Sequence, residues 1–482
     1  MSLDLSKIKI DKETVGFFRF KKLNNFFLLT NDIAYIKLSE KDFKDFLEGK
    51  LDKNGDSFKE LAERGFIKNF LPINKMVRIY RKKSDFLFRK GTSLHIIVVT
   101  KRCNHLCIYC QAGSPELQDP VYDMTEETAR KTVDLIFQGS NPNITIEFQG
   151  GEPLINWNVV KFIINYTREK EKKSNKKVHF GIATNLSLMT DEICKFLVDN
   201  DVGISTSLDG PEHIHNRNRP FNDPNGSYQI VDRWLKKIKN YFKENKKRGA
   251  GGALPTLTKY SLEHIEEIVD EYVRQGIASI HFRQLSYLGK SAGKEKKEEF
   301  GYTAEEFIAA WKRGMDYIIQ KNKEGFLITE RMAVTILARI LKDRSVSYLD
   351  FRSPCGLGIG MLSYFYDGTV YTCEVGRLIG DKTFLLGTVN DPYEKIMEKS
   401  RMKSFVEASI LDSSPCNECV YKPYCGICPA SNYALCGNFF PNMRTMDKCK
   451  IAEAQIDYLF LKIQDKQVLD IFKKWLERSK NN

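Results

Sequence analysis

The sequence predicts an α/β protein whose central part is a parallel sheet covered by helices. Between residues 94 and 323, short apolar runs alternate six times with amphipathic stretches of helical period. Strands that alternate with helices in this way form parallel sheets, because each helix returns the chain to the same end of the sheet. A short β-rich unit precedes this part, and a cysteine-rich segment follows it. We therefore expect two to three domains in the 482 residues.

The first 75 residues are expected to form a separate unit. Asparagine and aspartate turn residues separate three β-rich runs, which predicts a three-stranded meander, and residues that favour helix N-caps precede two amphipathic stretches. The predicted strands are 17–20, 26–29 and 34–38, and the predicted helices are 40–48 and 57–64.

The central part is expected to contain six strand and helix pairs. The predicted strands are 94–100, 144–148, 178–184, 203–208, 251–258 and 279–284. The predicted helices are 125–138, 155–171, 190–199, 227–244, 261–275 and 303–323, and the charged stretch 290–300 is expected to be an exposed loop. Ligand sites in such folds gather at the carboxyl ends of the strands. Functional residues are therefore expected in the segments that follow the strands.

Two motifs follow the first two central strands. Cys103, Cys107 and Cys110 have the spacing C-x3-C-x2-C, so three thiolates can hold three irons of a four-iron cluster and leave the fourth iron open. The second motif, Gln149 to Pro153, contains two glycines that let the backbone approach a ligand and a glutamate that can bind an amine. A zinc loop is the alternative for the cysteines by themselves. Together the motifs indicate an iron-sulfur cluster and an amine-bearing ligand.

With these two motifs, residues 94–290 resemble the radical S-adenosylmethionine (radical SAM) superfamily. The resemblance implies a partial (β/α)6 barrel, a SAM-binding [4Fe-4S] cluster and a reductant such as ferredoxin or flavodoxin. It also implies cleavage of SAM to a 5′-deoxyadenosyl radical that takes a hydrogen atom from a substrate. The residues to which it gives roles are Cys103, Cys107 and Cys110 as cluster ligands, Tyr109 at the adenine, Gly150, Gly151 and Glu152 at the SAM amine, Ser207 at the ribose, and Arg219 or Arg233 at the SAM carboxylate.

A second group of cysteines lies between residues 355 and 449, and its pattern resembles the SPASM domain, which implies two auxiliary [4Fe-4S] clusters. One interval is two residues long where three is usual, and Cys436 is surplus, so it is either a fourth ligand of the first auxiliary cluster or a free thiol. A pair of zinc ribbons is the alternative. The implied ligands are Cys355, Cys373 and Cys428 for the first auxiliary cluster, and Cys416, Cys419, Cys425 and Cys449 for the second.

Glu374 directly follows Cys373, where sulfatase-maturing relatives carry an aspartate that accepts a substrate proton. General-base chemistry needs a carboxylate within hydrogen-bond reach of the proton. The glutamate in place of aspartate leaves two alternatives, a catalytic base or a residue that supports the Cys373 loop.

The N-terminal unit resembles the winged-helix RiPP recognition element, which binds the leader of a ribosomally made precursor peptide by adding a strand to its sheet. A folded extension without this role is the alternative. The runs Phe17 to Phe20, Leu28 to Asp32, Leu94 to Ile96 and Arg102 to Gln111 are similar to the His-Xaa-Ser system radical SAM maturases. Together the resemblances imply a radical SAM/SPASM peptide maturase that acts on a precursor peptide with a leader, together with a partner maturase. The expected domains are 1–75, 90–325 and 326–458, followed by a helix and basic tail at 459–482.

Composition favours a reduced, cytoplasmic enzyme without a membrane segment. Twelve cysteines and no apolar leader favour metal ligands over disulfides, and no apolar run approaches the length of a bilayer span. The net charge of +13 comes from lysines spread over helix faces, which argues against a nucleic-acid partner. The alternatives are a sulfatase maturase that forms formylglycine from cysteine or serine, a tRNA-modifying radical SAM enzyme, and a non-catalytic electron-transfer or zinc-ribbon protein.

Overall fold

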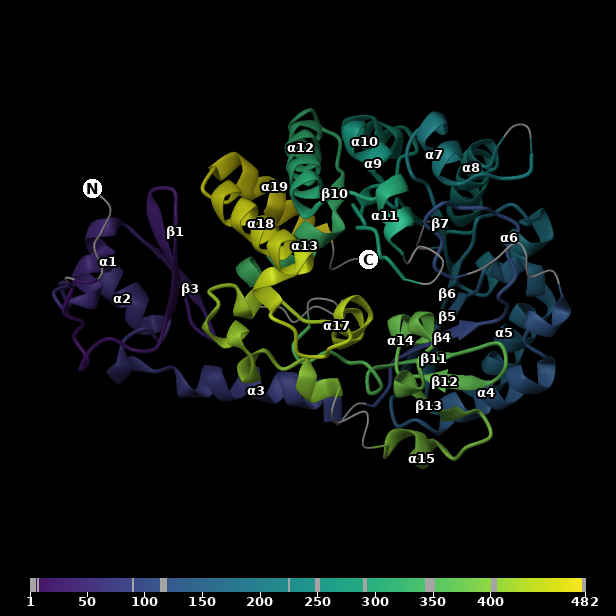
Figure 1. Cartoon of the computed structure of the whole chain (residues 1–482), viewed down its shortest axis with the longest axis horizontal. Coiled ribbons are helices and arrows are strands. Elements are labelled where there is room, and N and C mark those ends of the chain that lie inside the picture. The colour runs from purple at the N-terminus through teal and green to yellow at the C-terminus, as the bar shows by residue number, and fades with distance from the viewer. Residues whose placement is uncertain are drawn as a thin grey trace.

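The computed structural model describes residues 6, 8–88, 91–112, 119–223, 226–247, 252–288, 293–342, 352–399 and 405–478. In Figure 1 the N-terminal unit lies at one end of the long axis and the central sheet with its helices lies at the other. The C-terminal helices and loops lie between them, and the long helix α3 runs beneath these loops toward the central sheet.

The N-terminal unit contains an antiparallel sheet of order β1-β2-β3, followed by helices, which confirms the predicted meander and the two predicted helices. One face of the sheet packs on α1 and α2, with Phe27 and Leu29 in that core. The elements are β1 Arg19–Leu23, β2 Phe26–Thr30, β3 Tyr35–Leu38, α1 Glu40–Leu47, α2 Asp56–Glu63 and α3 Ile73–Phe88.

The first five predicted central strands form a parallel array, as the sequence predicted. They are β4 Leu94–Val98, β5 Asn143–Gln149, β6 Lys177–Ala183, β7 Val202–Ser207 and β8 Gly252–Leu254. The sixth strand, β9 Ser279–Ile280, is short and pairs with β10 Thr329–Glu330, and the adjoining chain meets the β8 side through the bridge of Thr256 with Arg283. The alternating pattern therefore predicted the strands but not all of their pairing.

Three strands that the sequence did not predict extend the sheet beyond β4. They come from the cysteine-rich segment, and the sheet order is β13-β12-β11-β4-β5-β6-β7-β8. The strand β11 is parallel to β4, whereas β12 and β13 continue antiparallel. Their bounds are β11 Met361–Tyr364, β12 Thr369–Tyr371 and β13 Leu385–Thr388. The cysteine-rich segment therefore shares one sheet with the central part.

Helices cover the outer face of the sheet, and the last two helices pack with α12 and α13 in one core. The expected loop at 290–300 contains a helix, α11, and the boundary expected at 458 falls inside α18. None of the described helices is both long and apolar enough to cross a membrane. The remaining helices are α4 Glu126–Gln138, α5 Trp157–Lys172, α6 Asp191–Asp199, α7 Glu212–Asn218, α8 Tyr228–Glu244, α9 Lys259–Glu263, α10 Ile265–Arg274, α11 Lys294–Phe300, α12 Ala304–Lys323, α13 Arg331–Lys342, α14 Glu374–Ile379, α15 Tyr393–Met397, α17 Pro429–Cys436, α18 Asp447–Lys462 and α19 Lys466–Arg478.

Candidate active site

The three-cysteine loop follows β4 and is tied to the chain that leaves α7. The Leu106 N–H donates to the carbonyl of Pro220 at 2.9 Å, and the Ile108 N–H donates to the carbonyl of Asn218 at 3.0 Å. These bonds fix the loop from the β7 side of the sheet. The cysteines therefore lie at the carboxyl end of the strands, where the sequence placed them.

The thiols of this loop lie close enough to affect one another. Burial raises the pKa of Cys103 to about 12, and the charges of Glu152, Cys107 and Cys110 raise it further. Burial also raises the pKa of Cys107 to about 11, although the charge of Arg219 opposes the shift. Cysteine ligands must lose their protons to bind a metal, so iron binding at this loop is coupled to proton release.

The two glycines after β5 allow the following loop to touch the cysteine loop. The Gly151 N–H donates to the Thr100 carbonyl at 2.9 Å, and the Glu152 N–H donates to the Arg102 carbonyl at 2.8 Å. A Cβ at Gly150 would lie 2.7 Å from the Thr100 carbonyl oxygen, and one at Gly151 would lie 2.1 Å from that of Arg102. Because these distances exclude a side chain, this approach requires glycine at both positions.

The carboxylate of Glu152 is buried and already has partners within the protein. It accepts hydrogen bonds from the Thr184 hydroxyl at 2.7 Å, the Asn185 N–H at 2.7 Å and the Leu154 N–H at 3.0 Å. Burial raises the pKa of Glu152 to about 7, although these three bonds oppose the shift. The side chain therefore ties the loop after β5 to the loop after β6, a role that the sequence did not indicate.

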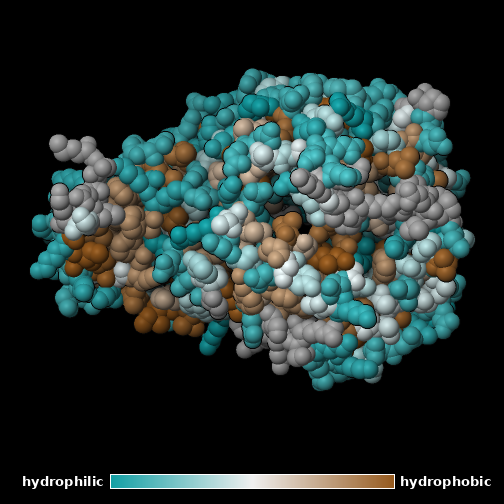
Figure 2. Space-filling model, viewed as in Figure 1, coloured by the Kyte–Doolittle hydropathy of each residue, from teal (hydrophilic) through white to brown (hydrophobic). Residues whose placement is uncertain are grey.

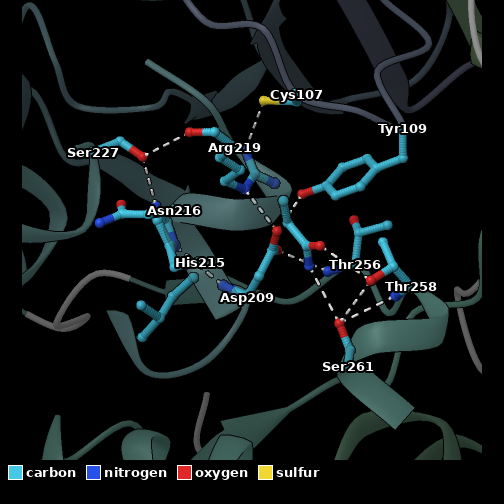
Figure 3. Close-up of polar contacts among 12 residues, drawn as sticks. Cys107, Tyr109, Asp209, His215, Asn216, Arg219, Ser227, Thr256, Thr258 and Ser261 are labelled. Carbon is cyan, nitrogen blue, oxygen red and sulfur yellow. Dashed lines mark hydrogen bonds and ion pairs between the residues drawn. The ribbon is translucent and has the colours of Figure 1, made fainter. Parts of the chain in front are cut away.

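A buried polar network joins Tyr109, Asp209 and Arg219 beside Cys107 (Figure 3). The Tyr109 hydroxyl donates to Oδ2 of Asp209 at 2.6 Å, and Arg219 Nε donates to the same oxygen at 3.0 Å. Nη1 of Arg219 lies 3.7 Å from the sulfur of Cys107. The other carboxylate oxygen of Asp209 accepts from the Thr256 N–H at 3.0 Å. A carboxylate held on both oxygens thus fixes a cation against a cysteine sulfur.

His215 supports this network from α7 (Figure 3). The Asp209 N–H donates to Nδ1 of His215 at 3.3 Å, and Nε2 lies 2.9 Å from the hydroxyl of Ser227. Burial lowers the pKa of His215 well below its ordinary value, so the ring is neutral. With Nδ1 as acceptor, Nε2 carries the proton and donates to Ser227.

Sequence analysis left Arg219 and Arg233 as alternatives for the SAM carboxylate, and the two lie in different surroundings. Arg219 lies at the cysteine loop, whereas Arg233 is exposed on α8. Ser207 ends β7 two residues before Asp209. Sequence analysis missed Asp209, because an aspartate before Gly210 is ordinary turn chemistry. Its place directly after the carboxyl end of a strand was the one signal that could have found it.

A cavity of about 2190 Å³ extends from the inner side of the sheet to the C-terminal cysteines. Figure 2 shows a hollow near the centre of the molecule's face, with apolar residues around it. Small residues on the inner face of two strands leave this space open, namely Gly181 and Ala183 on β6 and Gly203 and Ser205 on β7.

Charged side chains also line the cavity. Glu374 begins α14 and lines the same space as Glu147 on β5. Burial raises the pKa of Glu147 and the charge of Glu374 adds to the shift, whereas Gln149, Arg331 and Arg283 oppose it. Two carboxylates therefore face one cavity, and the sequence had indicated only Glu374.

The C-terminal cysteines form two groups along this cavity. Burial raises the pKa of Cys373 to about 12 with a further contribution from Cys428, and Cys355 packs in the same buried cluster. Burial raises the pKa of Cys425 to about 12, and the largest further contributions come from Cys419 and Cys449. The cysteines that line the cavity are Cys355, Cys373, Cys416, Cys419, Cys425, Cys428 and Cys449.

Cys436 lies apart from both groups. Its side chain is exposed, and its thiol donates to the carbonyl of Asn432 at 2.9 Å. This contact lies within α17 and belongs to the ordinary turn spacing of a helix. The geometry therefore favours the free thiol over the fourth cluster ligand.

Two arginines beside the two cysteine groups, buried Arg377 and half-buried Arg339, have few partners for their positive charge. Nε and Nη2 of Arg377 have no hydrogen-bond acceptor among the described residues, and burial lowers its pKa although Glu374 and Cys373 oppose the shift. Burial lowers the pKa of Arg339 to about 10, and its Nη1 donates to the Cys425 carbonyl at 3.3 Å. A buried cation is costly without a counter-charge. An anionic iron-sulfur cluster on the neighbouring thiolates would supply that charge, so the residues fit such a group.

Comparison with known proteins identifies a family and several relatives of this chain. The Radical SAM superfamily domain matches residues 97–272. Fe-coproporphyrin III synthase of Methanosarcina barkeri is 30% identical over 301 residues, which cover 58% of this chain and 68% of the relative. The cysteine-type anaerobic sulfatase-maturating enzyme of Clostridium perfringens is 23% identical over 340 residues, which cover 69% of this chain and 87% of the relative. The uncharacterized protein MJ0907 of Methanocaldococcus jannaschii is 31% identical over 204 residues, and this chain spans only 64% of that relative's length.

Two solved structures share the fold. Native anSMEcpe with bound AdoMet and Kp18Cys peptide matches with a TM-score of 0.64 and 20% identity over 80% of this chain and 99% of that chain. Streptococcus suis SuiB bound to precursor peptide SuiA matches with a TM-score of 0.53 and 15% identity over 90% of this chain and 98% of that chain.

The chain belongs to the radical SAM superfamily and is an enzyme. Membership implies SAM and one [4Fe-4S] cluster as cofactors. Sulfatase-maturating enzymes recur among the relatives.

Proposed function

We propose that this enzyme uses a SAM-derived radical to modify a ribosomally made peptide, as a radical SAM/SPASM peptide maturase. The observation that carries the proposal is the cavity of about 2190 Å³ that joins the inner sheet to seven cysteines. Pockets for small molecules usually enclose about 300–1,000 Å³. A cavity of twice that size suits a segment of peptide.

Cys103, Cys107 and Cys110 would hold the cluster that binds SAM. When bound, the cluster and SAM supply the 5′-deoxyadenosyl radical that takes a hydrogen atom from the substrate. Arg219 is held by Asp209 at 3.0 Å, beside Cys107, and is proposed to bind the SAM carboxylate. The small residues on β6 and β7 leave room for the peptide.

Glu374 is proposed as the group that receives the substrate proton. Its carboxylate lines the cavity within electrostatic reach of Glu147. A carboxylate in this position can form the hydrogen bond that general-base catalysis needs.

Two auxiliary [4Fe-4S] clusters are proposed at the C-terminal cysteine groups. Four thiolates on one zinc would place their sulfurs about 3.8 Å apart, at a zinc to sulfur distance of about 2.3 Å. Among the described residues, no group of three cysteine sulfurs lies within 4.8 Å. The wider spacing and the uncompensated Arg377 support clusters over zinc ribbons.

The N-terminal unit is proposed to bind the leader of the precursor peptide. The outer edges of β1 and β3 pair with no other strand in the described part of the chain, so a peptide strand can add there. Phe17 and Phe20 are 57% and 42% exposed, and apolar residues gather on this unit in Figure 2. A ferredoxin or flavodoxin would supply electrons to the enzyme, and a partner maturase would complete the modification.

Mass spectrometry of peptides incubated anaerobically with cluster-loaded enzyme, SAM and a reductant tests this function. A small His-Xaa-Ser-repeat peptide with its leader is expected to change mass, together with formation of 5′-deoxyadenosine. Formylglycine formation in a sulfatase peptide instead would favour the sulfatase-maturase alternative. Cleavage of SAM without a product from either peptide would contradict peptide maturation.

A further inference from the structure

The central strand β2 of the N-terminal sheet is buried on both faces, and its second face belongs to the C-terminal core. Phe27 and Leu29 point to the helices of their own unit, whereas Leu28 packs in the core that contains Tyr421 and Tyr424. All five residues of β2 are buried for this reason. The N-terminal unit therefore lies directly on the loop that follows Cys416 and Cys419.

Polar contacts across this boundary reach the backbone between the cysteines. Nε of Arg19 donates to the carbonyl of Asn417, and its Nη2 lies 3.3 Å from the side-chain oxygen of Asn417. The Thr30 hydroxyl donates to the carbonyl of Val420 at 2.7 Å. Asn417 follows Cys416 and Val420 follows Cys419, so each bond holds a residue adjacent to a proposed cluster ligand.

Asp32 of the N-terminal unit and Lys422 of the cysteine-bearing loop add an ion pair to these contacts. Asp32 accepts from Arg19 Nη2 at 3.0 Å and lies 3.2 Å from the amine of Lys422. The same amine donates to the side-chain oxygen of Asn417 at 2.8 Å. Asn417 is thus bound by one cation from each unit. Asp32 pairs with both cations, and Lys422 also pairs with Asp412.

Because Arg19 is buried, water cannot take the place of its partners in the loop. Arg19 is 4% exposed, its Nη1 has no hydrogen-bond acceptor among the described residues, and the ring of Phe17 lies 4.6 Å from its guanidinium carbon. A buried guanidinium needs its acceptors in fixed positions. The loop itself contains only two short 3-10 turns, Pro415–Glu418 and Lys422–Tyr424, so its shape depends on partners outside it.

We propose that the N-terminal sheet is a structural part of the second auxiliary site, and that Arg19 and Thr30 are positioning residues for the loop that carries Cys416 and Cys419. This inference rests on the proposed cluster at these cysteines. Its consequence is that the leader-binding unit and the second auxiliary site do not move independently. A peptide strand that binds the N-terminal sheet would therefore act on this site through Arg19 and Thr30.

Thiol labelling of the cluster-loaded enzyme tests the inference, with Arg19→Met and Thr30→Val as variants. Lys22→Met is the matched control, because Lys22 lies on the same strand but pairs with Glu40 at 2.8 Å on an exposed surface. We expect Cys416 and Cys419 to react roughly tenfold faster with an alkylating reagent in Arg19→Met, with a smaller increase in Thr30→Val, because these bonds restrain local opening.

Measurement of the iron content distinguishes a failure of this inference from a failure of the proposed function. Arg19→Met is expected to lose up to about four irons per chain, which is one cluster, while Lys22→Met retains them. Wild-type enzyme that never holds more than about four irons would contradict the proposed auxiliary clusters, whereas the labelling comparison needs only the thiols. Equal labelling rates in wild type, Arg19→Met and Thr30→Val would overturn the inference. Thr30→Val keeps the side-chain shape, so a folding failure of Arg19→Met still leaves a decisive variant.

Discussion

The first cysteine loop and the loop of the second auxiliary site are held in different ways. Arg219 and the chain after α7, about a hundred residues away, fix the first loop from within the same sheet. The second loop is fixed by Thr30 and Arg19, which are 390 and 398 residues away from their partners. The difference indicates that the proposed site of radical formation is self-contained, whereas the proposed second auxiliary site depends on a second folded unit.

The largest effect is expected from Cys103→Ala, Cys107→Ala and Cys110→Ala combined. Loss of three ligands removes the cluster that binds SAM, so 5′-deoxyadenosine formation should fall to background. About eight irons should remain, because the other ligands belong to another part of the fold. Anaerobic iron analysis and chromatography of the nucleoside measure both. Continued SAM cleavage would show that the first loop is not the site of radical formation.

The complementary change is Cys416→Ala with Cys419→Ala. Modified peptide should be lost, while SAM cleavage without peptide should continue, because the first loop has its own supports. Product and 5′-deoxyadenosine are measured in the same reaction, with Cys436→Ala as the control thiol. Loss of SAM cleavage in the double variant would show that the two sites are not independent.

Glu374→Gln keeps the size of the side chain and removes its basicity. Product formation is expected to fall about 10²-fold while SAM cleavage continues, if the carboxylate accepts the substrate proton. Glu147→Gln is a matched control from the same cavity. An unchanged ratio of product to 5′-deoxyadenosine in a fully loaded Glu374→Gln enzyme would assign Glu374 to support of the Cys373 loop.

Glu152→Gln tests whether the buried carboxylate that joins the loops after β5 and β6 stabilises the first site. The free energy of unfolding of the variant should be about 1–3 kcal/mol lower, because an amide cannot accept all the hydrogen bonds that the carboxylate accepts. The pKa of Glu152 is raised to about 7 in the folded state, so the folded protein holds this proton more strongly than the unfolded chain does. The contribution of this group to wild-type stability should therefore fall as the pH rises from about 4.5 to 7. Denaturant unfolding across this range should show the slope in wild type and its loss in the variant. A slope shared by both proteins would assign it to another group.

The smallest effect is expected from Arg377→Met beside Cys373. Removal of a buried positive charge makes reduction of a nearby cluster less favourable, so the potential of the first auxiliary cluster should become more negative by roughly 50 mV. Redox titration followed by electron paramagnetic resonance measures the change. Lys395→Met, an exposed lysine paired with Asp391, is the control. A change of the same size in both variants would contradict a local effect of Arg377.

Local patterns were sufficient to predict the parallel strands, the helices that follow them and the position of the first cysteine loop. Hydrophobic period and cysteine spacing are properties of a few neighbouring residues, so the sequence states them directly. For the C-terminal cysteines, the division into two groups came from the resemblance to the SPASM domain and not from spacing alone, and it did not decide the place of Cys436.

Tertiary structure alone decided the features that connect distant segments. No local signature marks the addition of β11 to β4, the position of Arg219 rather than Arg233 beside Cys107, the buried carboxylates of Asp209 and Glu152, or the contact of Arg19 with Asn417. Each depends on which faces of the sheet and helices meet, since a buried charge can be placed only where distant parts of the chain supply its partners. That condition is set by packing across the whole chain and not by residue spacing.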